Sequence, residues 1–514
     1  MNRVIASVVA ALAALLAGCA TLPPPEGRSE STAFTDTAGT RLGRAVAPKV
    51  ALHPGKTGIH AMPSPHDALA ARVLLAAAAE KSIDAQYFIW HGDEVGNLLF
   101  EAVWRAAERG VRVRLLLDDL NTAGLDPTIA ALEAHPNVEV RLYNPFVQRD
   151  ARLLGFVTDF SRLNRRMHNK SFTVDNQVSV VGGRNIGNEY FGAGTGVAFA
   201  DLDVMAVGEA VREVSKEFDL YWNSPSAFPA VGLVGTGGSE TIAALQERFA
   251  ATRIAPGVAE YADAVRDTPL VRDLLARDLS MEWTDVRVVH DNPAKTVEPG
   301  GSTDVLLFPL LVQTAGRPQR TLDLVTPYFV PGKDGTTSLV ALAGRGVRVR
   351  ILTNSLAASD VTAVHSGYAK RREELLRAGV QLFELKPTAA RESRETALKF
   401  GSGSSSSLHA KTFAVDGERI FVGSFNFDQR SALLNTEMGV VINSAPLAQR
   451  LAGTFDATVP RIAYEVVLVP DGGGLVWIER TESGEKRYGT EPQTSWWLRT
   501  QVELLSVLPI EWLL

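Results

Sequence analysis

The feature that most restricts the fold of this 514-residue chain is a short motif that occurs twice. The pattern His-x-Lys-x4-Asp stands in MHNKSFTVD at 167–175 and again in LHAKTFAVD at 408–416. A glycine-containing segment with an asparagine follows each copy, and every counterpart lies 241 residues further along the chain. Such matched spacing is not expected by chance, so the chain is a duplication. The paired residues are His168 with His409, Lys170 with Lys411, Asp175 with Asp416, and Asn185 with Asn426.

Apolar periodicity and turn residues predict that strands and helices alternate in both halves. The sequence RGVRVR also occurs in both, at 109–114 and at 345–350. A β-α-β-α-β order favours a parallel sheet covered by helices. We therefore expect an α/β fold with two homologous halves, each a mixed, largely parallel sheet flanked by helices, related by a pseudo-two-fold axis with one active site between them. The expected strands are 82–90, 111–119 and 138–145 in the first half, and 321–330, 347–355 and 380–385 in the second.

The length of the chain exceeds what a single ordinary core needs, so several regions are expected. The predicted regions are a signal peptide at 1–18, a flexible tether at 19–46, a first half at 47–235, a helical linker or insertion at 236–300, a second half at 301–460, and a C-terminal hairpin and helix at 461–514 that complete the second half.

The N-terminus predicts export. One positive charge precedes an apolar run at 4–17, which is too short for a comfortable membrane span and is typical of a signal peptide. LAGC at 16–19 resembles a bacterial lipoprotein box, in which the cysteine is lipidated and begins the mature protein. Cys19 is the only cysteine, which excludes an intramolecular disulfide. We expect an exported chain, lipid-anchored through Cys19 on the periplasmic side of a bacterial membrane, with the outer membrane as one candidate.

The repeated motif predicts a phosphate site. On a strand, His168 and Lys170 point to the same face, so each half offers an imidazole, an ammonium group and an amide on one surface. A metal site would favour carboxylates or thiolates, and a lysine among them would repel the cation. Lysines and amides instead suit a phosphate anion, with one histidine attacking phosphorus and the other protonating the leaving oxygen. The residues alone therefore predict phosphodiester transfer or hydrolysis without a metal or other cofactor.

Histidines in such roles need orienting groups, and carboxylates on neighbouring strands are the candidates. The segment 199–208 offers Asp201 and Asp203, and 433–442 offers Glu437. A carboxylate that accepts from Nδ1–H keeps Nε2 as the reactive atom. Asp175 and Asp416 fall at the predicted turns, where a structural role is expected.

The paired motifs resemble the phospholipase D superfamily over nearly the whole mature chain. This resemblance implies a covalent phosphohistidine intermediate, with His168 as nucleophile and His409 as general acid and then base. The segments DLDV and NTEMG match the places where the family keeps its histidine-orienting carboxylates, which gives that role to Asp201 and Glu437. The resemblance further implies phosphate binding by Lys170, Lys411, Asn185 and Asn426.

Other segments, among them QYFIWHGD, TPYFVP and the C-terminal LPIEWLL, resemble the bacterial cardiolipin synthases of the C type. Asn188 is one departure, because aspartate is expected at this position in GRNIGDEYF; it lies outside the predicted phosphate-binding set. The predicted lipoprotein box is another, because the better-known synthases of other types begin with membrane-spanning helices.

The resemblance implies transfer of a phosphatidyl group to phosphatidylglycerol, which makes cardiolipin, from phosphatidylethanolamine or a second phosphatidylglycerol. The same residues would serve a phospholipase D that uses water and releases phosphatidic acid, and the sequence leaves this alternative open. A net charge of −6 argues against a nucleic-acid partner. We expect phospholipid substrates at a membrane surface and a monomer with both half-sites in one chain.

Three features outside the motifs each have two interpretations. The segment 149–166 mixes apolar residues with five arginines. It either dips into a lipid surface or packs as an ordinary amphipathic loop. Trp496 and Trp497 are more typical of core or edge packing than of interface anchors. His91 has either a structural role or a contact with the substrate.

Overall fold

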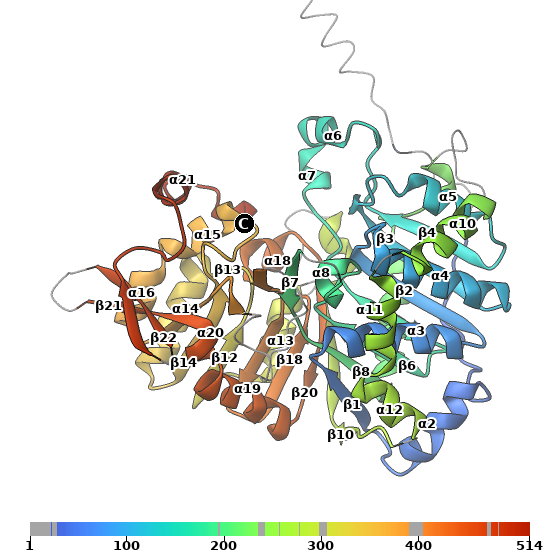
Figure 1. Ribbon diagram of the computed structural model, residues 1–514, viewed down its shortest axis with the longest axis horizontal. Coiled ribbons are helices and arrows are strands. Elements are labelled where there is room, and N and C mark those ends of the chain that lie inside the picture. Colours follow the sequence, from blue (N-terminus) through green and yellow to red (C-terminus); the bar gives the residue numbers. More distant parts are fainter. Residues whose placement is uncertain are drawn as a thin grey trace, which may run out of the picture.

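A computed structural model of the chain describes residues 22, 28–193, 196–234, 242–255, 257–276, 278–297, 306–389, 405–469, 474–481 and 483–514. The predicted signal peptide, Cys19 and most of the Asp-Gly-Gly-Gly segment at 471–474, which falls in the predicted C-terminal hairpin, lie outside these residues. Two α/β halves lie side by side, with the first in blue to green and the second in yellow to red (Figure 1).

The first half is built on a nine-stranded sheet in the order β10-β1-β8-β6-β5-β2-β3-β4-β9. Its strands are β1 (Thr57–Met62), β2 (Ser82–Ile89), β3 (Arg112–Asn121), β4 (Val138–Tyr143), β5 (Ser171–Val174), β6 (Val178–Gly182), β8 (Asp203–Gly208), β9 (Ala227–Pro229) and β10 (Glu282–Thr284).

The second half is built on a ten-stranded sheet in the order β11-β20-β18-β17-β12-β14-β15-β21-β22-β23. Its strands are β11 (Val286–His290), β12 (Thr321–Val325), β14 (Arg348–Asn354), β15 (Gln381–Leu385), β17 (Lys411–Val415), β18 (Arg419–Gly423), β20 (Met438–Ile442), β21 (Ala463–Leu468), β22 (Leu475–Thr481) and β23 (Gly484–Tyr488).

The order β8-β6-β5-β2-β3-β4 in one sheet repeats as β20-β18-β17-β12-β14-β15 in the other, as a duplication requires. Both sheets are mixed, as expected, but parallel pairing is confined to the three strands β2, β3 and β4 and their counterparts β12, β14 and β15. The other pairings in the two sheets are antiparallel, and they include those between the strands that carry and follow each motif, which tight turns join. The expectation of a largely parallel sheet therefore holds only for the β-α-β-α-β part.

The repeated RGVRVR segment performs the same task in each half. Gly110 and Gly346 have φ values of 90° and 85°, and each follows a helix, α4 (Glu94–Glu108) or α14 (Gly332–Gly344). Glycine is favoured at such left-handed positions because it has no Cβ. Four residues later, a buried arginine forms an ion pair with an aspartate of the neighbouring parallel strand. These pairs are Arg114 with Asp84 and Arg350 with Asp323, both at 2.6 Å.

The other helices cover the sheets and fill the connections. In the first half they are α2 (Arg41–Ala51), α3 (Pro65–Ala78), α5 (Asp126–Glu133), α6 (Arg152–Thr158), α7 (Phe160–Leu163), α8 (Asn188–Phe191) and α9 (Glu209–Trp222). In the second half they are α13 (Leu307–Ala315), α15 (Thr362–Ala369), α16 (Arg372–Arg377), α18 (Gln429–Leu433), α19 (Ala445–Ala457), α20 (Val459–Ile462), α21 (Trp496–Ser506) and η5 (Glu511–Leu513).

The predicted linker at 236–300 is more than a helical insertion. It contains α10 (Ile242–Arg253), α11 (Val258–Arg266) and α12 (Pro269–Leu275), and then gives one edge strand to each sheet. Strand β10 pairs with β1 in the first half, and β11 pairs with β20 in the second. The linker thereby joins the two sheets through backbone hydrogen bonds.

The predicted flexible tether at 19–46 is wrong for its described part. Residues 28–40 lie along the first half, where the backbone of Ala33 donates to Asp219 and that of Ser31 to Asn223. The guanidinium of Arg112 stacks on the Phe34 ring at 3.8 Å, and α2 begins at Arg41. Side chains of the first half accept hydrogen bonds from the backbone of this polar segment and hold it in place. The composition of the segment does not reveal these partners.

The two halves share an apolar cluster. Side chains of β6 and β8 meet those of β18 and β20 there, among them Val181, Val204, Val422 and Val440. Because the strands that follow the two motifs pack against each other, the motifs themselves are brought to one place. Among the described residues, no helix is both long enough and apolar enough to span a bilayer.

Candidate active site

His168 is fixed by the backbone of the other half. Met167 forms a parallel bridge with Thr436, and the His168 N–H donates to the Thr436 carbonyl at 2.8 Å. This bridge puts the next residue, Glu437, beside the imidazole, and the distance from His168 Nδ1 to Glu437 Oε2 is 2.8 Å. The carboxylate that orients the first histidine therefore comes from the second half.

His409 is held by the equivalent arrangement, with the roles of the two halves exchanged. Strand β7 (Val197–Ala200) of the first half pairs parallel with β16 (Ser405–Leu408) of the second, and the His409 N–H donates to the Ala200 carbonyl at 2.8 Å. The next residue, Asp201, places Oδ2 at 2.6 Å from His409 Nδ1. The carboxylate–histidine pairs are thus crossed between the halves, and neither half holds a complete pair.

The crossed pairs define which ring atom is reactive. A carboxylate beside Nδ1 accepts the Nδ1–H, which fixes the tautomer and leaves Nε2 without that proton. Both imidazoles are buried, with 7% of each residue exposed. Ring packing also holds them, because Phe88 meets His168 edge-on at 4.9 Å and Tyr190 meets His409 edge-on at 5.0 Å.

The two lysines lie next to the histidines and are buried with them. Lys411 Nζ lies 3.0 Å from both ring nitrogens of His409 and donates to the His409 carbonyl at 2.6 Å. Lys170 Nζ donates to the carbonyl of His168. Burial lowers the pKa of both ammonium groups, that of Lys411 to about 8, which the nearby carboxylates of Asp201 and Glu437 partly oppose.

The aspartates of the motifs point away from the histidines. Asp175 and Asp416 lie in the left-handed region, with φ values of 51° and 56°. Each accepts hydrogen bonds from three consecutive backbone N–H groups where the neighbouring strand begins. The donors are Glu80, Lys81 and Ser82 for Asp175, and Gln319, Arg320 and Thr321 for Asp416. Both carboxylates thus tie the motif hairpin to its sheet.

The two asparagines differ in their surroundings. Asn185 Oδ1 accepts from the Ile89 N–H at 3.2 Å and its Nδ2 donates to the Tyr190 hydroxyl at 3.1 Å. Asn426 is buried, and its Oδ1 has no hydrogen-bond partner within the described part of the chain. The protein therefore constrains the Asn426 side chain less than that of Asn185, whose amide is held at both ends.

The carboxylates of the two pairs have different pKa values. Burial raises the pKa of Asp201, but the charges of His409, Lys411 and Arg184 outweigh it and hold the pKa at about 2. Burial raises the pKa of Glu437 to about 7, and Lys170 and the Ser424 hydroxyl only partly oppose it.

The imidazoles both favour the neutral form. Burial, together with the positive charge of Lys411, lowers the pKa of His409 to about 4. Burial and the charges of Lys170 and Lys411 lower the pKa of His168 well below its ordinary value. A neutral His168 whose Nε2 carries a lone pair suits a nucleophile.

A cavity of about 350 Å³ opens beside His168 and Asn426. Its polar wall contains Asp428 and Arg430 of the second half. The rest of its lining is largely apolar and comes from both halves, with Phe88, Leu120, Phe156, Leu163, Val364 and Leu514 among the contributors. A largely apolar cavity with a few convergent polar groups suits a ligand that carries hydrocarbon next to an anion.

Sequence reasoning missed the residues that support Glu437. The Ser424 hydroxyl donates to Glu437 Oε2 at 2.5 Å, and the Glu437 N–H donates to Asp291 Oδ2 at 2.8 Å. Ser424 stands where the first repeat has Gly183, a difference that comparing the repeats reveals. Asp291 lies in the linker, where no motif marks it. Asp203, the other carboxylate considered for orienting a histidine, instead pairs with Arg72 at 3.0 Å.

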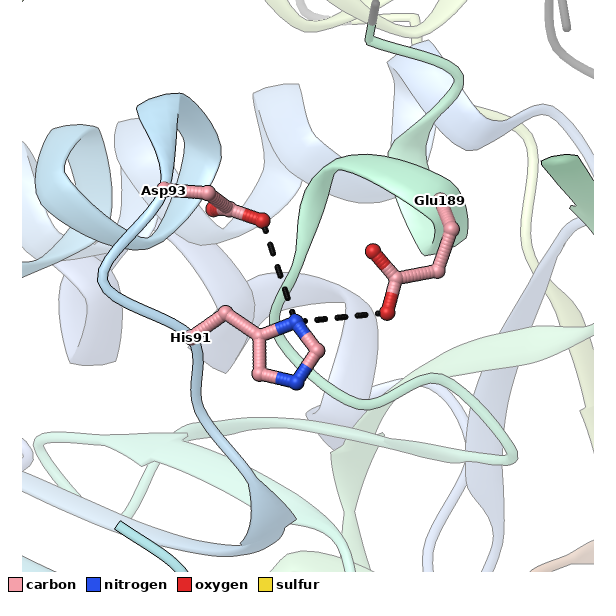
Figure 2. Close-up of side chains that lie close together, drawn as sticks. All are labelled: His91, Asp93 and Glu189. Carbon is pink, nitrogen blue, oxygen red and sulfur yellow. Dashed lines mark ion pairs between the residues drawn. The ribbon is translucent and has the colours of Figure 1, made fainter. Parts of the chain in front are cut away.

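Figure 2 shows a second cluster of charged groups, formed by His91, Asp93 and Glu189. Their ligand-type atoms lie within 4.8 Å of one another, and His91 Nδ1 lies 3.3 Å from Glu189 Oε1. Both oxygens of Asp93 are engaged, because they accept from the backbone N–H groups of Gly96 and Asn188. The cluster is explained as the N-cap of α4 and an ion pair, which gives His91 a structural role.

Known proteins match both halves of the chain. Residues 74–222 and 311–459 each match the family model described as cardiolipin synthase, PLD-like domain. Cardiolipin synthase C of Escherichia coli (strain K12) is 46% identical over 474 residues, which cover 92% of this chain and 100% of that protein. An uncharacterized protein of Helicobacter pylori (strain ATCC 700392 / 26695) is 30% identical over 507 residues, 96% of each chain.

A solved structure shares the fold. The phosphatidylserine synthase of Haemophilus influenzae Rd KW20 matches with a TM-score of 0.57 and 13% sequence identity, over 92% of this chain and 100% of that one. At this identity the likeness concerns the fold alone.

Proposed function

The chain belongs to the family of cardiolipin synthases with phospholipase D-like domains, and we propose that it transfers a phosphatidyl group from one phospholipid to phosphatidylglycerol, which makes cardiolipin. The observation that supports this most is the crossed pairing of His168 with Glu437 and of His409 with Asp201, with a largely apolar cavity beside His168. The donor is phosphatidylethanolamine or a second phosphatidylglycerol.

In the first step, His168 Nε2 attacks the phosphorus of the donor lipid. A P–N bond forms, the bond from phosphorus to the head-group oxygen breaks, and His409 gives its Nε2 proton to the departing alcohol. The pKa of His409, about 4, is too low for this proton at neutral pH. A phosphodiester anion held between the lysines opposes their charge and raises this pKa toward the working range.

In the second step, the hydroxyl of phosphatidylglycerol attacks the phosphohistidine. His409 takes the proton of that hydroxyl, the P–N bond breaks, and cardiolipin leaves with His168 restored. Lys170, Lys411 and Asn426 hold the phosphate oxygens and stabilise the charge that develops on them in both transition states. Asn185 belongs to the same set, although its amide is engaged by Ile89 and Tyr190.

The chain works at a membrane surface, where its substrates are. We infer that a lipid on Cys19 anchors it there, on the periplasmic side of a bacterial membrane. Since each histidine depends on a carboxylate of the other half within the same chain, a monomer is sufficient for activity.

Incubating the purified chain with phosphatidylglycerol vesicles, with and without phosphatidylethanolamine, and separating the lipid products tests the function. Cardiolipin as the main product supports transfer. Phosphatidic acid alone identifies a hydrolase and rejects the proposal. His168→Ala and His409→Ala each abolish the product, whereas full activity in either variant refutes a shared active site.

A further inference from the structure

Exposed apolar side chains gather on α6, at the rim of the cavity. Leu153, Leu154 and Val157 are 83%, 57% and 80% exposed. At about 100° per residue they lie within an arc of about 100° on this helix, so they form one outward face. We call these three residues the α6 face.

The opposite side of α6 is fixed to the protein. Phe156 packs edge-on against Phe146 at 5.5 Å and lines the cavity. The arginines of this segment are engaged within the protein: Arg149 pairs with Asp119 and Asp126, and Arg162 pairs with Asp159 at 2.6 Å. If this segment dips into a lipid surface, as one of its two interpretations has it, the contact is made by its apolar side chains and not by these arginines.

A second outward face lies on α21. Trp496, Trp497 and Leu504 are at least half exposed and also lie within an arc of about 100°, whereas Val502 on the other side of the helix is buried. We call these three residues the α21 face. The expectation that the two tryptophans pack in the core or at an edge is wrong, because the helix turns them to the outside.

Residues that neighbour the two faces line the same cavity, namely Phe156 of α6 and Leu513 and Leu514 after α21. The segment after α21 ends at Leu513 and Leu514, whose carbonyls accept from Arg430 at 2.9 and 3.0 Å. Arg430 also donates to Asn164, which follows α7. In Figure 1, α6 and α21 project on the same side of the two sheets, and α2 lies on the other side.

We propose that the α6 face and the α21 face form a membrane-docking surface, whose occupant is the interfacial region of a phospholipid bilayer, so that the cavity opens toward the lipid. The inference rests on the proposed function, because a lipid substrate must pass its hydrocarbon from the bilayer into the cavity. Tryptophans and aliphatic side chains on one helix face are typical of interfacial docking. Contiguous exposed apolar groups are unfavourable in water unless a partner covers them.

Tryptophan fluorescence tests this directly in the full-length chain on vesicles of phosphatidylglycerol and phosphatidylethanolamine. Lipids brominated in the upper part of their acyl chains quench only tryptophans that enter the bilayer, whether or not a lipid anchor holds the chain. We expect quenching in the wild-type chain and its loss in Trp496→Phe/Trp497→Phe. Equal quenching in both chains, or none in a wild-type chain that makes cardiolipin, overturns the docking surface.

Kinetics on vesicles provide the second readout. Leu153→Ser/Val157→Ser should raise the vesicle concentration for half-maximal rate about tenfold or more, because two aliphatic side chains no longer enter lipid. The rate in detergent-mixed micelles should change less than about twofold, since the site itself is intact. Leu52→Ser is the matched control, because Leu52 is 77% exposed at the end of α2 and should have no effect.

Two further outcomes are distinguishable. One is that light scattering shows the wild-type chain to be a dimer and the serine variants to be monomers. If the vesicle kinetics of these variants are also unchanged, the faces bind a second copy of the chain, and the bilayer is overturned as their occupant. A wild-type chain that inserts its tryptophans but makes no cardiolipin supports the docking surface while rejecting the proposed function.

Discussion

The half-site around His168 and the half-site around His409 stand on equivalent strands, yet their carboxylates differ. Asp201 is surrounded by His409, Lys411 and Arg184, which hold its pKa at about 2. Burial instead raises the pKa of Glu437 to about 7. A duplicated scaffold can therefore give two identical imidazoles different proton chemistry, which suits a nucleophile on one side and an acid and base on the other.

The two carboxylates also differ in the small residue that lies beside each of them. A Cβ on Gly183 would lie 2.2 Å from Asp201 Oδ1, so no side chain fits beside this short carboxylate. In the other half the equivalent residue is Ser424, whose hydroxyl donates to Glu437. The small residue and the carboxylate in each half-site are matched to each other.

Replacing either carboxylate of the two half-sites should have the largest effect on activity. Asp201→Asn and Glu437→Gln should each lower kcat by about 10² to 10⁴, because the amide favours the wrong imidazole tautomer. Steady-state cardiolipin formation measures this. A loss of less than threefold in either variant would show that its carboxylate does not orient the histidine.

Replacing the two asparagines should have the next largest effect, and the two variants should differ in thermal stability. Asn426→Ala should lower kcat/KM by about 10 to 10², the loss of a hydrogen bond to a charged group, while the melting temperature stays nearly unchanged. Asn185→Ala should also lower the melting temperature, because Asn185 bonds to Ile89 and Tyr190. Rates and thermal melts of both variants check this, and equal melting losses in the two would contradict the difference.

The pH profile should sharpen the contrast further. Glu437 loses its charge as the pH falls through about 7, and kcat/KM should then fall by up to about tenfold per pH unit. Asp201 stays ionised over this range because its pKa is about 2. Glu437→Gln should lose the limb near pH 7, whereas Asp201→Asn should keep it. A limb retained by Glu437→Gln would assign it to another group.

The aspartates of the two motifs should show the smallest effect on activity. Asp175→Asn should lower the free energy of unfolding by about 1–3 kcal/mol, because a fully buried acceptor of three N–H groups loses its charge. Asp416 is more exposed, so Asp416→Asn should cost less than about 1 kcal/mol. Urea unfolding measures both. A kcat reduced more than tenfold in a folded Asp416→Asn would indicate a chemical role.

Much of this site could be predicted from the sequence. The repeat spacing identifies His168, Lys170 and their counterparts, since a motif that occurs twice with matched surroundings carries its own control. Asp201 and Glu437 are candidates because DLDV and NTEMG match the places where the resembled family keeps its histidine-orienting carboxylates. The pairing of each with the histidine of the other half could not be predicted, because it depends on how the two sheets pack.

Other features follow from tertiary context. Ser405–Leu408 forms strand β16, although three serines favour turns, because β7 of the other half supplies its hydrogen bonds. The ordered segment at 28–40 depends in the same way on Asp219 and Asn223. The exposure of the apolar side of α21 could not be predicted, because the sequence pattern of an apolar stripe is the same whether the stripe faces a core or a bilayer.

In the proposed mechanism His168 is the nucleophile, and trapping the phosphohistidine intermediate tests this most directly. The chain is mixed with radiolabelled phosphatidylglycerol, quenched within the first turnover and digested under alkaline conditions that preserve phosphohistidine. We predict a phosphatidyl group on the peptide that contains His168, and none on that peptide in His168→Ala. A phosphatidyl group on the peptide that contains His409 instead would contradict it.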